Sequence, residues 1–354
     1  MSEGQDPPAP VRCRVDGEDS TLLIGDEGIE AGLRVIPWHA VDTMADAGSS
    51  IVIGTAQGTD PAVTAITISH LGAGRDTVAR DMRERRNRSR RPAMGVGDLA
   101  SEDSYEARDS NVVTGGAGAV TYIDLTANGA VLERGGDVAR FLPWGLVEGV
   151  ERSGYLISFP LRWGDPAQIS GLGRRTDEFL DDVDRLRRDL SRATGEAAAQ
   201  LGAGGVPMED GWAVSEPPVV SAWLEAAGET ESGVLREVCG EWRAGLFLEG
   251  AVAPVPFLIG RTSSDATIVE GVGTEDRATF VFDSPDTDRV NAALLLSSFR
   301  RELLFWPDDR LGPWTAAIRT QPEVRWLRSA LKARVVHDER WADRLRSVSQ
   351  GAGA

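Results

Sequence analysis

The hydrophobic positions of this chain form short clusters of β-branched residues, followed by longer stretches with a helical period. The segments SSIVIGTA (49–56) and TAITISHL (64–71) gather Ile, Val and Thr between Gly, Asp and Pro residues, as β-strands do. After them the period changes: in the segment 177–190 the apolar residues recur at helical spacing, at Phe179, Val183, Leu186 and Leu190. The pattern predicts a unit of short strands that ends in one amphipathic helix.

This unit occurs twice, because residues 21–91 and 120–192 align block by block. Each copy has a Gly at a two-strand turn, then an aliphatic-Pro-Trp phrase, and then a Leu-Gly pair before the helix. The length differences between the copies fall between these blocks, as loop variation in a duplicated domain does. The turn glycines are Gly28 and Gly129, and the phrases are IPWHAV (36–41) and LPWGLV (142–147).

The repeated Pro-Trp pair predicts a strand boundary and a core anchor. Pro37 and Pro143 have no N–H for a sheet ladder, so we expect each at the first residue of a strand or on an edge strand. Trp38 and Trp144 are expected to be buried, and to serve the fold rather than to contact a ligand.

The order of strands and helix, with the aliphatic-Pro-Trp-x-x-Val phrase inside it, resembles bacterial domains of the pleckstrin-homology superfold over about residues 20–90 and 120–195. The resemblance implies a bent, barrel-like antiparallel sheet plugged by a C-terminal helix. It also implies a family that mostly binds proteins, peptides or lipids and rarely catalyses reactions. Members that bind phosphoinositides carry Lys and Arg in the first hairpin. Here that hairpin reads IGDEGIEAG (24–32) and LTANGAVLE (125–133), so phosphoinositide binding is not expected.

The remaining segments complete the domain organisation. Residues 1–20 and 92–119 are polar and acidic, which predicts a disordered N-terminus and a flexible acidic linker before a second unit at 120–201. A loose stretch at 202–218 precedes a C-terminal region at 219–348. The predicted fold class is α+β, with two tandem pleckstrin-homology-like units followed by a mixed, helix-rich C-terminal region.

The C-terminal region carries its own series of predicted elements. Ser284 and Pro285 predict the start of one helix, as N-cap and first helical residue. Because strands and a capped helix follow one another again, residues 250–305 are a candidate for a third, diverged copy of the unit. We predict helices at 219–228 and 233–247, strands at 253–260, 266–273 and 277–284, and two terminal amphipathic helices within 322–348.

Composition bounds the partners and the location. The formal net charge of −17 should repel nucleic acid and anionic membranes, so contact with either needs a local basic patch. Cys13 and Cys239 have no metal-ligand spacing and indicate a reducing compartment. The N-terminus has no signal-peptide pattern, and the chain has no apolar run of ~18 residues. We therefore expect no membrane insertion and a cytoplasmic location.

An arginine run at 80–91 is the main oddity of this acidic chain. One interpretation is a solvated helix end whose arginines pair with nearby acids. The other is an anion-binding or partner-binding patch for nucleic acid, a phosphorylated partner or an acidic protein surface. The second copy has only the weaker run RLRRDLSR (185–192). The candidate residues are Arg80, Arg83, Arg85, Arg86, Arg88, Arg90 and Arg91.

Catalytic chemistry finds little support in the sequence. His39 and His70 align with Gly145 and Gly171, so the fold does not require either histidine, and no nucleophile motif accompanies them. The segment LGAGRD (71–76) lacks the full dinucleotide fingerprint and predicts a turn with a helix cap. The acidic clusters have no partner histidine or metal-like array. No catalytic residue, metal or cofactor is expected.

The sequence thus predicts a non-enzymatic cytosolic interaction or scaffold protein. It would bind a protein partner through its pleckstrin-homology-like units and its Trp-rich C-terminal region. The alternative is an accessory subunit of a nucleic-acid-processing machine that contacts phosphates through the arginine run. A third hypothesis, an enzyme with its site in residues 205–320, requires a polar pocket there and a strongly perturbed titrating group.

Overall fold

The computed structural model describes residues 10–59, 63–93, 103–110, 121–134, 137–248, 254–273 and 277–350. The chain is a mixed α+β protein with several antiparallel sheets, which confirms the predicted fold class at this level. It divides into two compact units. Unit 1 comprises residues 1–98, 133–140 and 306–322, and unit 2 comprises residues 99–132, 141–305 and 323–354.

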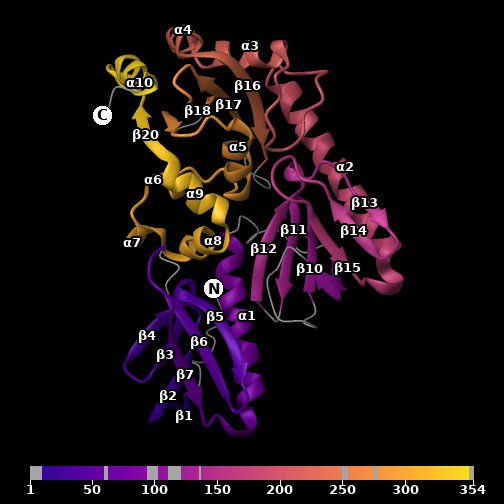
Figure 1. Ribbon diagram of the computed structural model, residues 1–354, viewed down its shortest axis with the longest axis vertical. Helices are drawn as coiled ribbons and strands as arrows, with labels where there is room; N and C mark the ends of the chain where they lie inside the picture. Colours follow the sequence, from indigo (N-terminus) through magenta and orange to yellow (C-terminus); the bar gives the residue numbers. More distant parts are fainter. Residues whose placement is uncertain are drawn as a thin grey trace, which may run out of the picture. The chain divides into compact units, whose positions relative to one another are not determined.

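A seven-stranded antiparallel sheet forms the larger part of unit 1 (Figure 1). Its strands are β1 (Val11–Val15), β2 (Glu18–Ile24), β3 (Gly28–Ala31), β4 (Arg34–Pro37), β5 (Val41–Ala47), β6 (Ser50–Ala56) and β7 (Val63–Ser69), in the order β4-β3-β2-β1-β7-β6-β5. β1 pairs with β2 along its whole length and with β7 at its end, where Val15 lies opposite Ile68. The sheet is open, with β4 and β5 as its edges, and does not close into the barrel that the resemblance implied.

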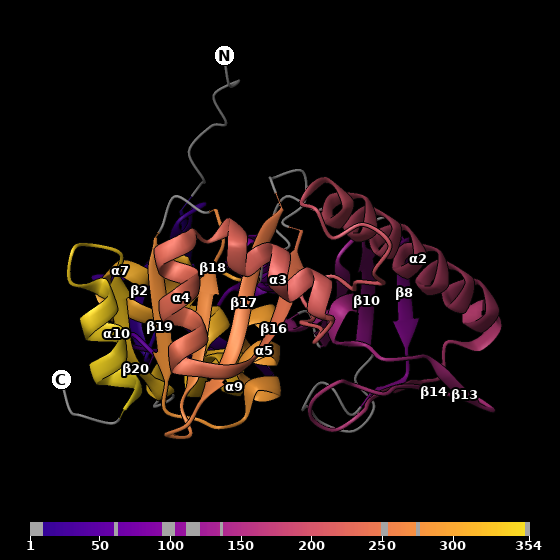
Figure 2. The ribbon, with the colours of Figure 1, turned by 90° about the horizontal axis from the view of Figure 1, so that it is seen from above.

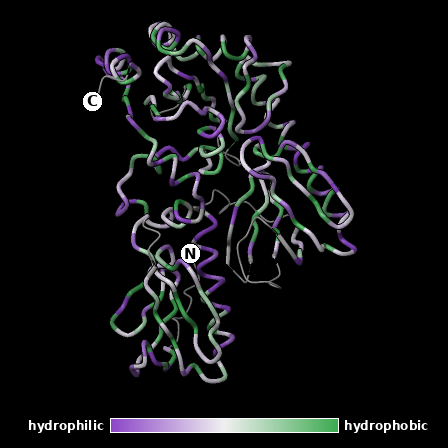
Figure 3. Tube along the Cα trace, in the orientation of Figure 1, coloured by the Kyte–Doolittle hydropathy of each residue, from purple (hydrophilic) through white to green (hydrophobic). Residues whose placement is uncertain are grey.

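The helix α1 (Arg75–Ala93) follows β7 through a short 3-10 turn, η2 (Gly72–Gly74). Val78, Ala79 and Met82 place its apolar face in the same buried cluster as the sheet residues, whereas much of the helix is hydrophilic (Figure 3). α1 also contacts a segment from much later in the chain that belongs to unit 1. That segment contains α7 (Asp308–Leu311), η5 (Gly312–Trp314) and α8 (Thr315–Thr320).

The second copy repeats this strand order in two smaller sheets. They run β12-β11-β10-β8 and β13-β14-β15-β9, so the broken strand β8–β9 takes the place of β1. Arg108 lies at the break, and η4 (Gly173–Arg175) leads into the long helix α2 (Thr176–Gln200). The strands are β8 (Asp103–Ala107), β9 (Asp109–Ser110), β10 (Thr121–Thr126), β11 (Gly129–Arg134), β12 (Asp137–Pro143), β13 (Glu151–Ser153), β14 (Leu156–Phe159) and β15 (Ala167–Ser170).

The Pro-Trp phrases adopt the same turn in both copies. Each proline is the last residue of an edge strand, β4 or β12, and each tryptophan opens a 3-10 turn, η1 (Trp38–Ala40) or η3 (Trp144–Leu146). The expected edge position is therefore correct, and the expected strand start is wrong. Both indoles are buried, and each Nε1 donates to a carbonyl of the preceding hairpin, Gly25 at 3.0 Å or Thr126 at 2.9 Å.

The repeated glycines are required by a close approach of two strands. A Cβ atom on Gly28 would lie 2.3 Å from the carbonyl oxygen of Ile36, and one on Gly129 would lie 2.4 Å from that of Leu142. Any other residue would push away the strand that carries the Pro-Trp phrase. The duplicated blocks thus form one structural device, which holds the phrase against its hairpin.

Two of the expected unstructured segments contain strands. β1 and the start of β2 lie within residues 1–20, which the sequence assigned to a disordered tail. β8 and β9 lie within residues 92–119, which the sequence assigned to the linker. β1 and β8 join their sheets through main-chain hydrogen bonds, and these bonds require few apolar residues. The other residues of these two segments lie mostly outside the described part.

The C-terminal region of unit 2 is a five-stranded antiparallel meander between two layers of helices (Figure 2). The strands β16 (Cys239–Phe247), β17 (Val255–Thr262), β18 (Thr267–Gly271), β19 (Ala278–Phe282) and β20 (Leu331–Val336) lie in chain order. On one face lie α3 (Pro217–Ala226), α4 (Glu229–Val238) and α10 (Trp341–Ser349). On the other lie α5 (Thr287–Leu296) and α9 (Pro322–Ala330), and the short helix α6 (Glu302–Phe305) contacts β20. Trp223, Trp242 and Trp341 share one buried cluster with the strands.

Several predictions for this region need correction. The predicted helix at 233–247 ends at Val238 and continues as β16, and residues 331–336 form β20 rather than part of a terminal helix. The N-cap of α5 is Asp286, whose side chain accepts from the Arg289 N–H, and not Ser284. The strands within 250–305 belong to the meander, so they do not reproduce the strand order of the repeated unit.

Candidate functional site

Two members of the arginine run are buried rather than exposed to anions. Arg86 donates from Nε to the Val41 carbonyl oxygen at 3.1 Å and from Nη2 to that of Asp42. Arg90 donates from Nη2 to the same two oxygens, at 2.8 and 3.1 Å. The two guanidinium groups therefore hold the chain where it leaves the first Pro-Trp turn.

A third buried guanidinium joins them from the segment 306–322. Arg319 donates from Nη1 to the Gly58 carbonyl oxygen at 2.9 Å and from Nη2 to that of His39, and its Nε lies 3.4 Å from the Asp42 carboxylate. Burial lowers the pKa of Arg319, and the Asp42 charge opposes this shift. Burial, and then the Arg319 charge, lowers the pKa of His39. The group that fixes the first Pro-Trp turn is thus a cationic cluster built from two distant parts of the chain.

The other arginines of the run lie nearer the surface. Arg85 pairs with Asp81 at 2.9 Å and with Asp26, and Arg91 pairs with Glu133 at 2.7 Å. Arg83 is partly buried, whereas Arg80 and Arg88 are exposed. The structure therefore favours a structural role for much of the run. An anion patch on α1 would be limited mainly to its exposed members.

Replacing Arg86 with Met should lower the free energy of unfolding by about 1–3 kcal/mol, because the carbonyls of Val41 and Asp42 lose a donor. Replacing the exposed Arg88 with Met should change it by less than about 0.5 kcal/mol. Urea denaturation followed by far-UV circular dichroism measures both. Equal effects of the two substitutions would contradict the structural role of Arg86.

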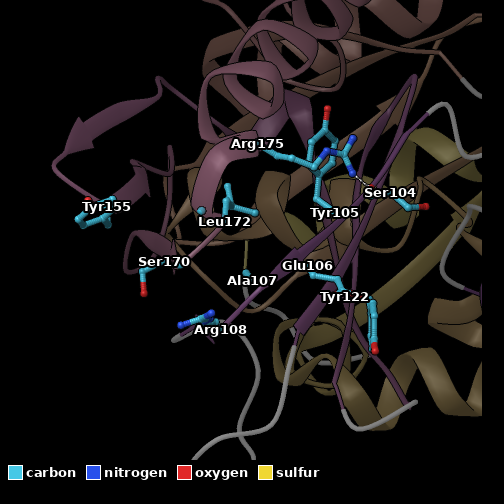
Figure 4. A pocket seen from close by; sticks show the side chains of 12 residues that line it. Ser104, Tyr105, Glu106, Ala107, Arg108, Tyr122, Tyr155, Ser170, Leu172 and Arg175 are labelled. Carbon is cyan, nitrogen blue, oxygen red and sulfur yellow. Dashed lines mark hydrogen bonds between the residues drawn. The ribbon is translucent and has the colours of Figure 1, made fainter.

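The second copy carries an open groove of about 880 Å³ beside β8 (Figure 4). β8, the start of β10, the β13–β14 turn and residues 170–175 line it. Tyr122 and Tyr155 are exposed and lie on opposite sides of the groove, with Arg108 between them. The floor contains the buried ring of Tyr105, which meets Phe179 of α2 edge-on with ring centroids 5.0 Å apart.

Arg175 closes one end of this groove. Its Nη1 donates to the Ser104 carbonyl oxygen at 2.8 Å, and its guanidinium carbon lies 4.1 Å from the centre of the Tyr105 ring. Nε and Nη2 bind the two carboxylate oxygens of Glu178, each at 2.9 Å, and this contact lowers the pKa of Glu178. At the other end the Arg108 N–H donates to the Ser170 carbonyl oxygen at 3.0 Å.

The groove is a feature of the second copy that the sequence analysis missed. Arg175 aligns with Gly74 of the first copy, and the strand that breaks at Arg108 is continuous in β1. The signal was present in the aligned segments LGAGRD and LGRRTD, because Arg174 and Arg175 of the second copy stand where the first copy has Ala73 and Gly74. It could not be interpreted without β8, which lies in the expected linker.

A buried carboxyl group lies beside a smaller cavity in unit 2. Asp210 is almost wholly buried, and its Oδ1 accepts from the Leu248 N–H at 2.7 Å. Desolvation raises the pKa of Asp210 to about 7, against the opposing effect of that hydrogen bond. The cavity, of about 200 Å³, also has Arg187 and Arg188 in its lining.

Asp210 also explains why the second copy has Gly145 where the first has His39. A Cβ atom on Gly145 would lie 1.7 Å from the Asp210 carbonyl oxygen. Residues 205–320 therefore do contain a strongly perturbed titrating group beside a polar cavity, which the enzyme hypothesis required. In the described part of the chain, the hydrogen bond that Asp210 accepts comes from a main-chain N–H, and no hydroxyl or thiol nucleophile is hydrogen-bonded to this carboxyl group.

The third histidine belongs to a buried polar network in the C-terminal sheet. His337 Nε2 lies 3.0 Å from a Glu270 carboxylate oxygen, and the Thr279 hydroxyl donates to the other oxygen at 2.5 Å. The Trp341 indole donates to that hydroxyl at 2.8 Å and stacks on the imidazole. The network ties α10 to β18 and β19, so His337 has a structural role.

Metal and thiol chemistry find no site in the described residues. Within them, no group of three or more His, Cys, Asp or Glu side chains could hold a metal ion. Cys13 and Cys239 are both buried, and desolvation raises the pKa of each thiol, that of Cys239 to about 12. Both thiols are therefore poor nucleophiles at neutral pH.

Comparisons with known proteins do not assign the chain to a family. No protein-family model matches the chain, and no curated protein is significantly similar to it. Among the described residues, none of the helices is both long and apolar enough to cross a membrane.

Proposed function

We propose that this chain is a non-enzymatic, cytoplasmic interaction protein, in which two pleckstrin-homology-like units and an α/β C-terminal region bind a protein partner. Both copies have the same strand order followed by one helix, and this shared order supports the proposal of two related units. The observation that carries the proposal is the groove beside β8, because it exposes Tyr122 and Tyr155, and because Arg175 at its end stands where the first copy has Gly74. Exposed aromatic side chains around a hollow are typical of protein-binding surfaces.

A photo-crosslinking capture tests this proposal. The full chain, with a photoreactive phenylalanine at Tyr122, should crosslink to a protein of its own cell lysate, because Tyr122 lines the groove. The same probe at Leu33, an exposed residue of unit 1, is the matched control. Mass spectrometry identifies the products. No product at Tyr122 beyond that at Leu33 would contradict binding through the groove, and no stable partner in any form would contradict the function.

Treatment with nuclease distinguishes this proposal from the alternative, in which the arginine run contacts nucleic acid. If capture required nucleic acid, treatment with nuclease would remove it, and substitution of the exposed Arg80 and Arg88 by Ser would weaken it with a reduced salt dependence. Capture that survives nuclease and these substitutions supports a direct protein partner.

A further inference from the structure

We propose that the groove beside β8 binds an extended segment of a partner protein, which pairs with the free edge of β8 and directs an acidic side chain at Arg108. This inference rests on the proposed function and assigns it to one strand edge. Three observations carry it: the direction of the main-chain groups of β8, the charge of the groove, and its aromatic rims.

The main chain of β8 offers an unused donor and acceptor in the middle of the groove. The Ser104 carbonyl and the Arg108 N–H both point away from β10, toward residues 170–175. Main-chain groups of alternate residues in a strand point to the same side, so the N–H and carbonyl of Glu106 also point into the groove. Glu106 lies opposite Tyr122 in the register with β10. Because the main-chain groups of Glu106 point away from β10, these two residues form a non-hydrogen-bonded pair. Within the described residues, neither group has a partner on the groove side.

A strand edge of this kind is a template for one further strand. Pairing with one residue of an incoming extended segment would satisfy both groups of Glu106, as in β-strand addition. The edge is short, because Arg175 occupies one end and the Ser170 carbonyl the other. The partner segment therefore makes its main-chain contacts over about three residues and relies on side chains for the rest of its affinity.

The charge at one end of the groove favours an acidic side chain there, because Arg108 lies at that end, whereas the Glu106 carboxylate in the lining disfavours acidic side chains elsewhere. The other arginine of the groove, Arg175, is already neutralised by Glu178 through two hydrogen bonds. Arg108 is exposed and forms no ion pair within the described part of the chain. A carboxylate of the partner at Arg108 would gain a charge-assisted contact, in a protein whose net charge of −17 otherwise repels acidic partners. Apolar side chains on either side would pack on Tyr122 and Tyr155.

The test uses a phage-displayed library of random linear 12-residue peptides, selected on the full chain. We expect the selected peptides to carry Asp or Glu beside apolar residues. The tightest peptide should bind Arg108→Glu at least about tenfold more weakly, whereas the exposed Arg192→Glu on α2 controls for charge alone. It should also bind Glu106→Pro about tenfold more weakly than Glu106→Ala, because only proline removes the N–H that faces the groove.

Each other result overturns the inference. Failure to select any peptide, or selected peptides that bind all variants equally, removes the groove as the site. Proline-rich peptides that still bind Glu106→Pro would show a polyproline mode instead of strand pairing. Circular dichroism checks that Glu106→Pro folds, and Tyr122→Ala replaces it if it does not, with the same expected weakening. If a cellular partner is captured but is indifferent to Arg108→Glu, this inference fails while the proposed function stands.

Discussion

Replacing Trp38 or Trp144 with alanine is expected to lower the free energy of unfolding by about 3–5 kcal/mol. Each indole is buried in the core of its own copy, and each donates a hydrogen bond to the preceding hairpin. The substitution leaves a cavity and an unsatisfied carbonyl where the strand with the Pro-Trp phrase meets that hairpin. Urea denaturation followed by far-UV circular dichroism measures the loss.

Two further substitutions serve as a conservative variant and as a control. Trp38→Phe keeps one buried aromatic ring but loses the Nε1–H donor and part of the indole volume, so it should cost less than alanine, about 1–3 kcal/mol. Leu33→Ala, at an exposed position of the same unit, should change stability by less than about 0.5 kcal/mol. Hydrogen exchange should show reduced amide protection in β1–β7 when Trp38 is replaced, and in β10–β12 when Trp144 is replaced. A loss below about 1 kcal/mol at both tryptophans would contradict their role as core anchors.

The repeat made this part of the fold predictable. Gly28 and Gly129 recur because a carbonyl approaches each too closely for a side chain, and the tryptophans recur because each fills the same core position. His39 and Gly145 differ, because the two copies meet different neighbours at that turn. Comparing the copies therefore separated residues that the fold requires from residues that one copy alone uses.

Elements that depend on pairing could not be predicted in this way. Among the described side chains of β8, Tyr105 and Ala107 are buried, and their alternation is too short to stand out from a polar linker. β16 follows α4 without a break, so its buried residues continue an apolar run that suits a helix equally well. In both places pairing with a later strand, β10 or β17, selects the strand.

The candidate sites depend even more on distant contacts. Nothing in the arginine run indicates that the carbonyls of Val41 and Asp42 face Arg86 and Arg90, so a buried cluster looks like an exposed patch. The groove exists only because β8 and residues 170–175 are brought together, and Asp210 is buried only through packing around Gly145 and Leu248. Sequence patterns report which face of an element is apolar, but not what covers that face.

The substitution Asp210→Asn is expected to stabilise the protein above pH 7 and to remove a fall in stability between about pH 4 and pH 7. Burial raises the pKa of Asp210 from 3.8 to about 7, so the folded state holds this proton more tightly than the unfolded state does. The stabilisation is complete below the unfolded pKa and is lost as the pH rises through the folded pKa. The shift corresponds to roughly 4 kcal/mol as an upper bound. Asparagine keeps an acceptor for the Leu248 N–H without the charge.

The measurement is the free energy of unfolding of the wild type and of Asp210→Asn at pH 5, 6, 7 and 8. The difference between the two proteins isolates Asp210, because exposed carboxylates such as Asp338 and Glu237 have lowered pKa values and act in the opposite direction in both. Asp184→Asn, which changes an exposed carboxylate in the lining of the same cavity, is the control and should follow the wild type. A constant difference between the wild type and Asp210→Asn across this range would mean that the Asp210 carboxylate is solvated in the folded state.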